Sequence, residues 1–109
     1  MKQLIIFLTI ITLNTTLFSS SANTADCLIL HDENSIVCKY THLRKDSDTN
    51  ITVQWIEPTG EMTREKFLVI PATHGSVYDY RYIKGRTKGE WTFKVIDNNK
   101  EYTTNFIIE

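Results

Sequence analysis

The feature that most restricts the fold is the alternation of apolar and polar residues in "GEWTFKVIDNNKEYTTNFII", residues 89–108. A period of two is typical of a strand that buries one face. The alternation is interrupted at Asn98 and Asn99, and asparagine tolerates the left-handed backbone that a two-residue hairpin turn requires. This register predicts three facing pairs, namely Trp91 with Phe106, Phe93 with Thr104 and Val95 with Tyr102.

Short strand signals of the same kind recur along the chain, with turn residues between them and no long stretch of helical periodicity. In the third signal, Ile51, Val53 and Trp55 share one side. We expect strands at residues 27–31, 36–41, 50–56, 62–70, 77–83, 90–97 and 101–108. About seven half-buried antiparallel strands predict an all-β fold, an immunoglobulin-like or fibronectin-like sandwich, with a small closed barrel as the alternative.

One of these strands carries an unusual aromatic pattern within "SVYDYRYIKGR", residues 76–86. Tyr78, Tyr80 and Tyr82 share one face of the strand, because alternate side chains point the same way. The other face carries Val77, Asp79 and Arg81. A strand with charges on one side normally buries the other, so we expect the tyrosines to face the core.

The N-terminus predicts a cleaved secretory signal peptide. Lys2 is followed by an uncharged, mostly apolar run at residues 4–13 and then by the small residues of "SSSANTA". Ser20 and Ala22 suit cleavage after Ala22, and cleavage after Ala25 is the weaker alternative. The apolar run is short for a membrane anchor. We therefore expect a signal peptide within residues 1–25 and one exported domain at residues 26–109, periplasmic or secreted.

Two cysteines, Cys27 and Cys38, flank the turn-rich segment "HDENS", which predicts a hairpin. A loop centred on Asp32 and Glu33 would place Cys27 opposite Cys38, whereas a loop shifted by one residue would pair Cys27 with Tyr40. Only the first register lets the sulfurs meet. We expect a disulfide, because export leads to an oxidising compartment and no CxxC spacing indicates free thiols for redox or metal chemistry.

The charge balance argues against nucleic acid as a partner. Removing the predicted signal takes away one of the 12 Lys and Arg residues and no acid, which leaves 11 against 13 Asp and Glu, a formal net charge of −2. Nucleic-acid-binding domains carry a basic footprint instead.

No pattern in the chain assembles a catalytic or metal site, and we expect neither an enzyme nor a bound cofactor or metal. The histidines, His31, His42 and His74, lack the close spacing of zinc ligands, and "HDE" at residues 31–33 fits a solvated hairpin tip. No nucleophile elbow or glycine-rich phosphate loop is present.

Two surface features are candidates for modification or binding. Asn50 begins the acceptor triplet Asn-Ile-Thr and could be glycosylated in an exported protein. A basic segment could dock an anionic surface, the alternative being a solvated loop balanced by nearby acids. Its cations are Arg81, Lys84, Arg86 and Lys88.

The closing segment "GEWTFKVIDNNKEYTTNFII" resembles the last hairpin of bacterial periplasmic or secreted Ig-like domains of unknown function, in which a glycine-x-aromatic strand is followed by a final strand ending in F-x-I. Trp55 is similar to the core tryptophan of an immunoglobulin strand. The two cysteines depart from the antibody pattern, because both fall on the first two strands.

These observations favour an exported, non-enzymatic β-sandwich that serves as a binding or accessory module for an envelope protein or an anionic surface polymer. One alternative is a carrier of a small ligand or metal that uses the histidines at the loop ends. Another is a secreted inhibitor or effector that presents the loop "PATHGS", residues 71–76.

Overall fold

The computed structural model describes residues 23–109, so the predicted signal sequence up to Ala22 lies outside the described residues. Seven strands fill most of the described chain. They are β1 (Thr24–Leu30), β2 (Ser35–Thr41), β3 (Thr49–Ile56), β4 (Met62–Ile70), β5 (Ser76–Tyr82), β6 (Gly89–Asp97) and β7 (Lys100–Ile108). A single 3₁₀ turn, η3 (His31–Glu33), joins β1 to β2. Within this range no helix is long and apolar enough to cross a bilayer.

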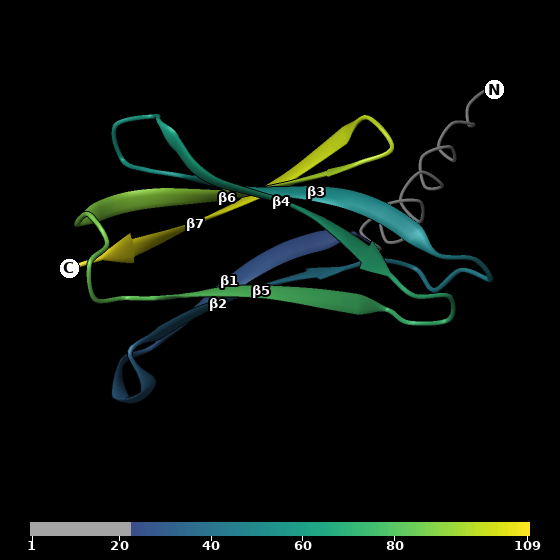
Figure 1. Ribbon diagram of the computed structural model, residues 1–109, viewed down its shortest axis with the longest axis horizontal. Helices are drawn as coiled ribbons and strands as arrows, with labels where there is room; N and C mark the ends of the chain where they lie inside the picture. Colours follow the sequence, from purple (N-terminus) through teal and green to yellow (C-terminus); the bar gives the residue numbers. More distant parts are fainter. Residues whose placement is uncertain (1–22) are drawn as a thin grey trace, which may run out of the picture.

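The strands form two antiparallel sheets stacked face to face, which confirms the predicted all-β sandwich (Figure 1). One sheet has the order β1-β2-β5 and the other the order β4-β3-β6-β7. The sheets remain separate, so the barrel alternative is wrong. On one side of the sandwich β1 packs along β7. On the other side, the edge strands are β4 and β5.

The core lies between the sheets and is rich in aromatic side chains. Trp55 on β3 is fully buried and meets Phe93 and Phe106 edge to face, at centroid distances of 5.4 and 5.7 Å. Trp91 stacks on Phe106 at 6.0 Å. Alternate residues of β2, β3, β6 and β7 supply most of the inner positions, and Ile70 of β4 adds another.

Both hairpins have the predicted registers. Trp91 faces Phe106, and the turn places Asn98 and Asn99 at φ values of 54° and 68°, as a two-residue turn requires. In the first hairpin Cys27 lies opposite Cys38 and is bonded to it, with 4.1 Å between their Cα atoms. The disulfide therefore joins neighbours within one sheet and does not bridge the two sheets.

The prediction that the tyrosines of β5 face the core is wrong. Tyr78, Tyr80 and Tyr82 are 57, 57 and 59% exposed on the outer face of the three-stranded sheet. Asp79 is only 6% exposed and points into the sandwich, with Arg81 on the same face. The charged face of β5, which was expected to face solvent, is therefore its inner face.

The reversal follows from what β5 meets across the sandwich. The indole N–H of the buried Trp55 needs an acceptor, since an unpaired buried donor costs about 1–3 kcal/mol. The Oδ2 atom of Asp79 accepts from this N–H at 2.8 Å. Because β5 is an edge strand, charged groups on its inner face also reach solvent through the open side of the sandwich.

Alanine substitutions at two tyrosines of the same sheet will show which of them is packed in the core and which lies on the surface. Tyr40 is fully buried and its hydroxyl donates to Asp97 Oδ2 at 2.7 Å. We expect Tyr40→Ala to lower the free energy of unfolding by about 3–5 kcal/mol and Tyr80→Ala to lower it by less than about 1 kcal/mol. Urea denaturation measures both, and equal losses would show that Tyr80 is packed in the core.

Reduction of the Cys27–Cys38 disulfide should lower the free energy of unfolding by about 2–3 kcal/mol, because it frees a short loop in the unfolded chain. Urea denaturation with and without a reductant measures the difference. The double variant Cys27→Ala, Cys38→Ala is the control and should not respond to the reductant. Two titratable thiols in the unreduced protein would contradict this prediction.

Candidate functional site

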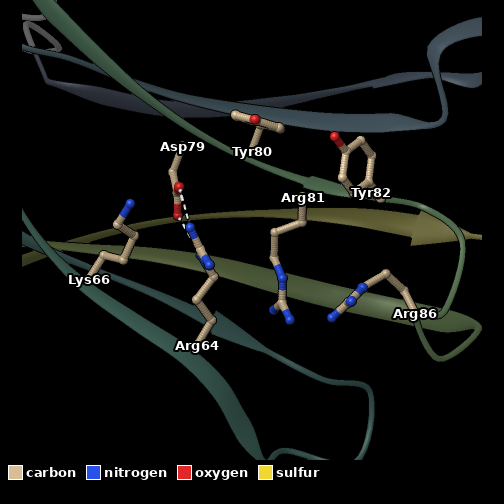
Figure 2. A pocket seen from close by; sticks show the side chains of 7 residues that line it. All are labelled: Arg64, Lys66, Asp79, Tyr80, Arg81, Tyr82 and Arg86. Carbon is tan, nitrogen blue, oxygen red and sulfur yellow. Dashed lines mark hydrogen bonds and ion pairs between the residues drawn. The ribbon is translucent and has the colours of Figure 1, made fainter.

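A cleft of about 410 Å³ lies between the edge strands β4 and β5, and most of the side chains that line it are charged (Figure 2). Arg64 and Lys66 come from β4, Asp79 and Arg81 from β5, and Arg86 from the loop after β5. Alternation along each strand brings the side chains into the same space, because Arg64 and Lys66 share the face of β4 that also carries the buried Ile70.

Asp79 links the strands that form this cleft. Its carboxylate accepts the Trp55 indole N–H and two hydrogen bonds from Arg64, at 3.1 Å from Nε and 3.0 Å from Nη2. A bidentate arginine pair of this kind is directional as well as strong. The aspartate therefore ties β3, β4 and β5 together across the two sheets.

Burial alone would raise the pKa of Asp79. The hydrogen bonds from Arg64 and Trp55, with the positive charges of Arg64 and Lys66, outweigh burial and hold that pKa below its usual range. The same pairing with Asp79 raises the pKa of Arg64. Asp79 is thus a carboxylate near neutral pH, with its charge matched by that of Arg64.

Arg81 lies over the aromatic core at the mouth of the cleft. Its guanidinium carbon is 5.5 Å from the Trp55 ring and 5.9 Å from the Trp91 ring, within the range of cation–π contacts. Burial, followed by the positive charges of Arg86 and Arg64, lowers its pKa. The guanidinium remains protonated at physiological pH because its ordinary pKa is so high.

Arg86 approaches Arg81 from the loop, and Figure 2 shows its guanidinium group extended toward that of Arg81. The Nε atom of Arg86 is buried and has no hydrogen-bond partner. Within residues 23–109 the ion pairs are Arg64 with Asp79 and Lys94 with Glu101. The other three cations of the cleft, Lys66, Arg81 and Arg86, therefore have no carboxylate partner within the described chain.

This arrangement can bind an oxyanion. Two guanidinium groups that repel each other and a third cation nearby gain free energy when a carboxylate, sulfate or phosphate lies between them. The chain as a whole has a formal net charge of −1, so the cleft opposes the sign of the molecule. Glu57 lies near enough to raise the pKa of Arg81, but its effect is smaller than that of the two arginines.

Of the four cations predicted from the basic segment, the structure brings two into the cleft. Arg81 and Arg86 line it, whereas Lys84 and Lys88 are exposed and do not. Arg64 and Lys66, which line the cleft from β4, were not among the predicted residues. Their signal is the alternation of β4, which places both on the same face as Leu68 and Ile70.

The other predicted positions lie apart from this cleft. Asn50 lies on β3, and its side chain is exposed. His31 lies in the exposed turn before β2, while His42 is buried after β2 with its Nε2 3.2 Å from the His74 carbonyl oxygen. His31 is thus separated from the other two by the length of β2, and residues 23–109 contain no group of three or more potential metal ligands.

Hydrogen bonds to the segment before β3 hold the loop at residues 71–76 in place. The backbone N–H of Ala72 donates to Asp48 Oδ1 at 2.8 Å, and that of Thr73 donates to the Lys45 carbonyl at 2.7 Å. Thr73 has a φ of 70°.

Comparison with known proteins adds no family assignment. No protein-family model matches the chain, and no curated protein matches it significantly.

Acid should weaken the fold through Asp79. Its folded pKa lies below its unfolded value, so the stability it contributes is present above about pH 4 and is lost as the pH falls through the folded pKa. We expect Asp79→Asn to cost about 3 kcal/mol at pH 7 and to flatten the acid side of the stability profile. Urea denaturation from pH 7 to pH 2 tests this, and an equally steep acid loss in the variant would contradict it.

Proposed function

We propose that the protein is an exported, non-enzymatic β-sandwich whose β4–β5 cleft binds an acidic group of an envelope protein or a surface polymer. The observation that carries this proposal is the facing pair Arg81 and Arg86, without a carboxylate between them. A group with the opposite charge relieves their repulsion and supplies an acceptor for the buried Nε of Arg86. Complementary charge of this kind gives a binding site its specificity.

Export is supported by the disulfide, which is stable in an oxidising compartment. The position of β1 favours one cleavage site over the other. Because β1 begins at Thr24, cleavage after Ala22 leaves it whole, whereas cleavage after Ala25 removes its first two residues. Cleavage after Ala22 also keeps Asn23, whose side-chain amide donates to the Tyr40 hydroxyl at 2.8 Å.

We further assign the domain to the broad immunoglobulin-like sandwiches, in keeping with the resemblance of its last hairpin to bacterial periplasmic domains. Its three-stranded sheet corresponds to the first, second and fifth strands, and its fourth strand pairs with the third. An antibody constant domain places the fourth strand in the other sheet and joins the sheets by a disulfide. The first of these differences leaves β4 opposite β5, where the cleft forms.

Poly-L-glutamate is the probe for the proposed site, and the tryptophan emission is the readout, since Arg81 lies over Trp55 and Trp91. We expect saturable binding at low ionic strength that weakens as salt is added. Arg86→Gln should weaken binding about tenfold, because it removes a hydrogen-bonded charge worth about 1.5 kcal/mol or more.

The matched control is Lys88→Gln, which removes the same charge from the same loop at an exposed position outside the cleft. It should change the affinity less than about twofold. Equal losses in the two variants would mean that only the general charge of the loop matters. Failure of the protein to bind poly-L-glutamate or dextran sulfate at low salt would contradict the proposed function.

A further inference from the structure

We infer that the partner is an extended peptide segment that adds as a strand to the open edge of β5 and places acidic side chains in the cationic cleft. This inference rests on the proposed function and specifies the partner. Three observations carry it: the peptide groups that β5 turns outward, the cations on one side of that edge and the tyrosines on the other.

The direction of the β5 peptide groups follows from the two ends of the strand. The carbonyl of Gly75 accepts from the N–H of His42 at 2.9 Å, and the N–H of Ile83 donates to the carbonyl of Asn34 at 3.0 Å. Both bonds point toward β2 and its flanking residues. Because peptide groups alternate along a strand, the odd-numbered residues of β5 face β2 and the even-numbered residues face away.

The disulfide supports this assignment. A Cα separation of 4.1 Å between Cys27 and Cys38 is that of a pair without direct ladder hydrogen bonds, so the peptide groups of Cys38 face β5. Asp79 is its partner there. Tyr78, Tyr80 and Tyr82 therefore direct their N–H and C=O groups to the open edge, where no other strand of residues 23–109 pairs with β5.

The two faces of this edge differ in chemistry. Arg81 and Arg86 lie on the inner side, and Tyr80 and Tyr82 lie on the outer side, as Figure 2 shows. A strand added to β5 alternates in the same way, so its side chains would face the cations and the tyrosines in turn. The segment that fits has two acidic residues separated by one apolar residue, with further apolar residues on either side.

The charges also determine what the edge rejects. Inward-pointing charges on edge strands normally prevent pairing with other strands. Here a second copy of the same edge would add its own Arg81 and Arg86 to the cations already present, since its Asp79 is paired with Arg64, whereas an acidic strand would neutralise them. The charges thus disfavour pairing of this edge with copies of itself and with apolar strands, and they favour pairing with an acidic strand.

The test uses the protein with its disulfide intact and a fluorescently labelled peptide in which valine and glutamate alternate. We expect fluorescence anisotropy to show binding that Arg86→Gln weakens. The same peptide, N-methylated at every second residue on the edge that would pair, keeps all its charges but loses its backbone donors. We expect it to bind at least about tenfold more weakly.

A variant of the protein tests the same backbone hydrogen bonds by removing a donor from β5 instead of from the peptide. Tyr80→Pro removes one outward N–H from an edge position, where proline is tolerated. Tyr80→Ala removes the ring and keeps that N–H. The proline variant should bind the alternating peptide several-fold more weakly than the alanine variant, and circular dichroism should show the sheet in both.

The outcomes separate this inference from the proposed function. Equal affinity of the methylated and unmethylated peptides would overturn strand addition, while loss of binding in Arg86→Gln would still support the anion-binding cleft. Binding of dextran sulfate without binding of the alternating peptide would overturn the inference in favour of a polymer partner. If no anion binds at low salt, both proposals fail.

Discussion

The hydrogen bonds of one buried carboxylate hold the open side of this sandwich together. Asp79 accepts from Trp55 on β3 and from Arg64 on β4, although it lies on β5 in the other sheet. With Arg64 bound to Asp79, Lys66, Arg81 and Arg86 remain as the uncompensated cations of the cleft. The pair therefore fixes both the distance between the edge strands and the charge that the cleft presents.

The strands and their pairing could be predicted from the sequence because they depend on local alternation. Trp91 opposite Phe106 and Cys27 opposite Cys38 both follow from a period of two and a short turn. These are contacts between neighbours along the chain. The order of the two sheets depends on crossings between distant strands, and no local pattern in this sequence specifies those crossings.

The candidate site was predicted only in part, for two physical reasons. Alternation separates the faces of β5 but does not say which face is inner, and the buried Trp55 N–H makes the charged face the inner one. Arg64 and Lys66 lie on a different strand from Arg81, so only the stacking of the two sheets brings them together. A buried tryptophan that needs an acceptor is the signal to consider when an edge strand carries an isolated aspartate.

The position of the disulfide has a mechanical consequence. Cys27, Cys38 and Asp79 form one row across the three-stranded sheet, at the level of the buried carboxylate. A pull along β5 would load the hydrogen bonds between β5 and β2 in shear, and the covalent bond would pass that tension on to β1. The sheet that bears the open edge would then resist force as three strands acting together.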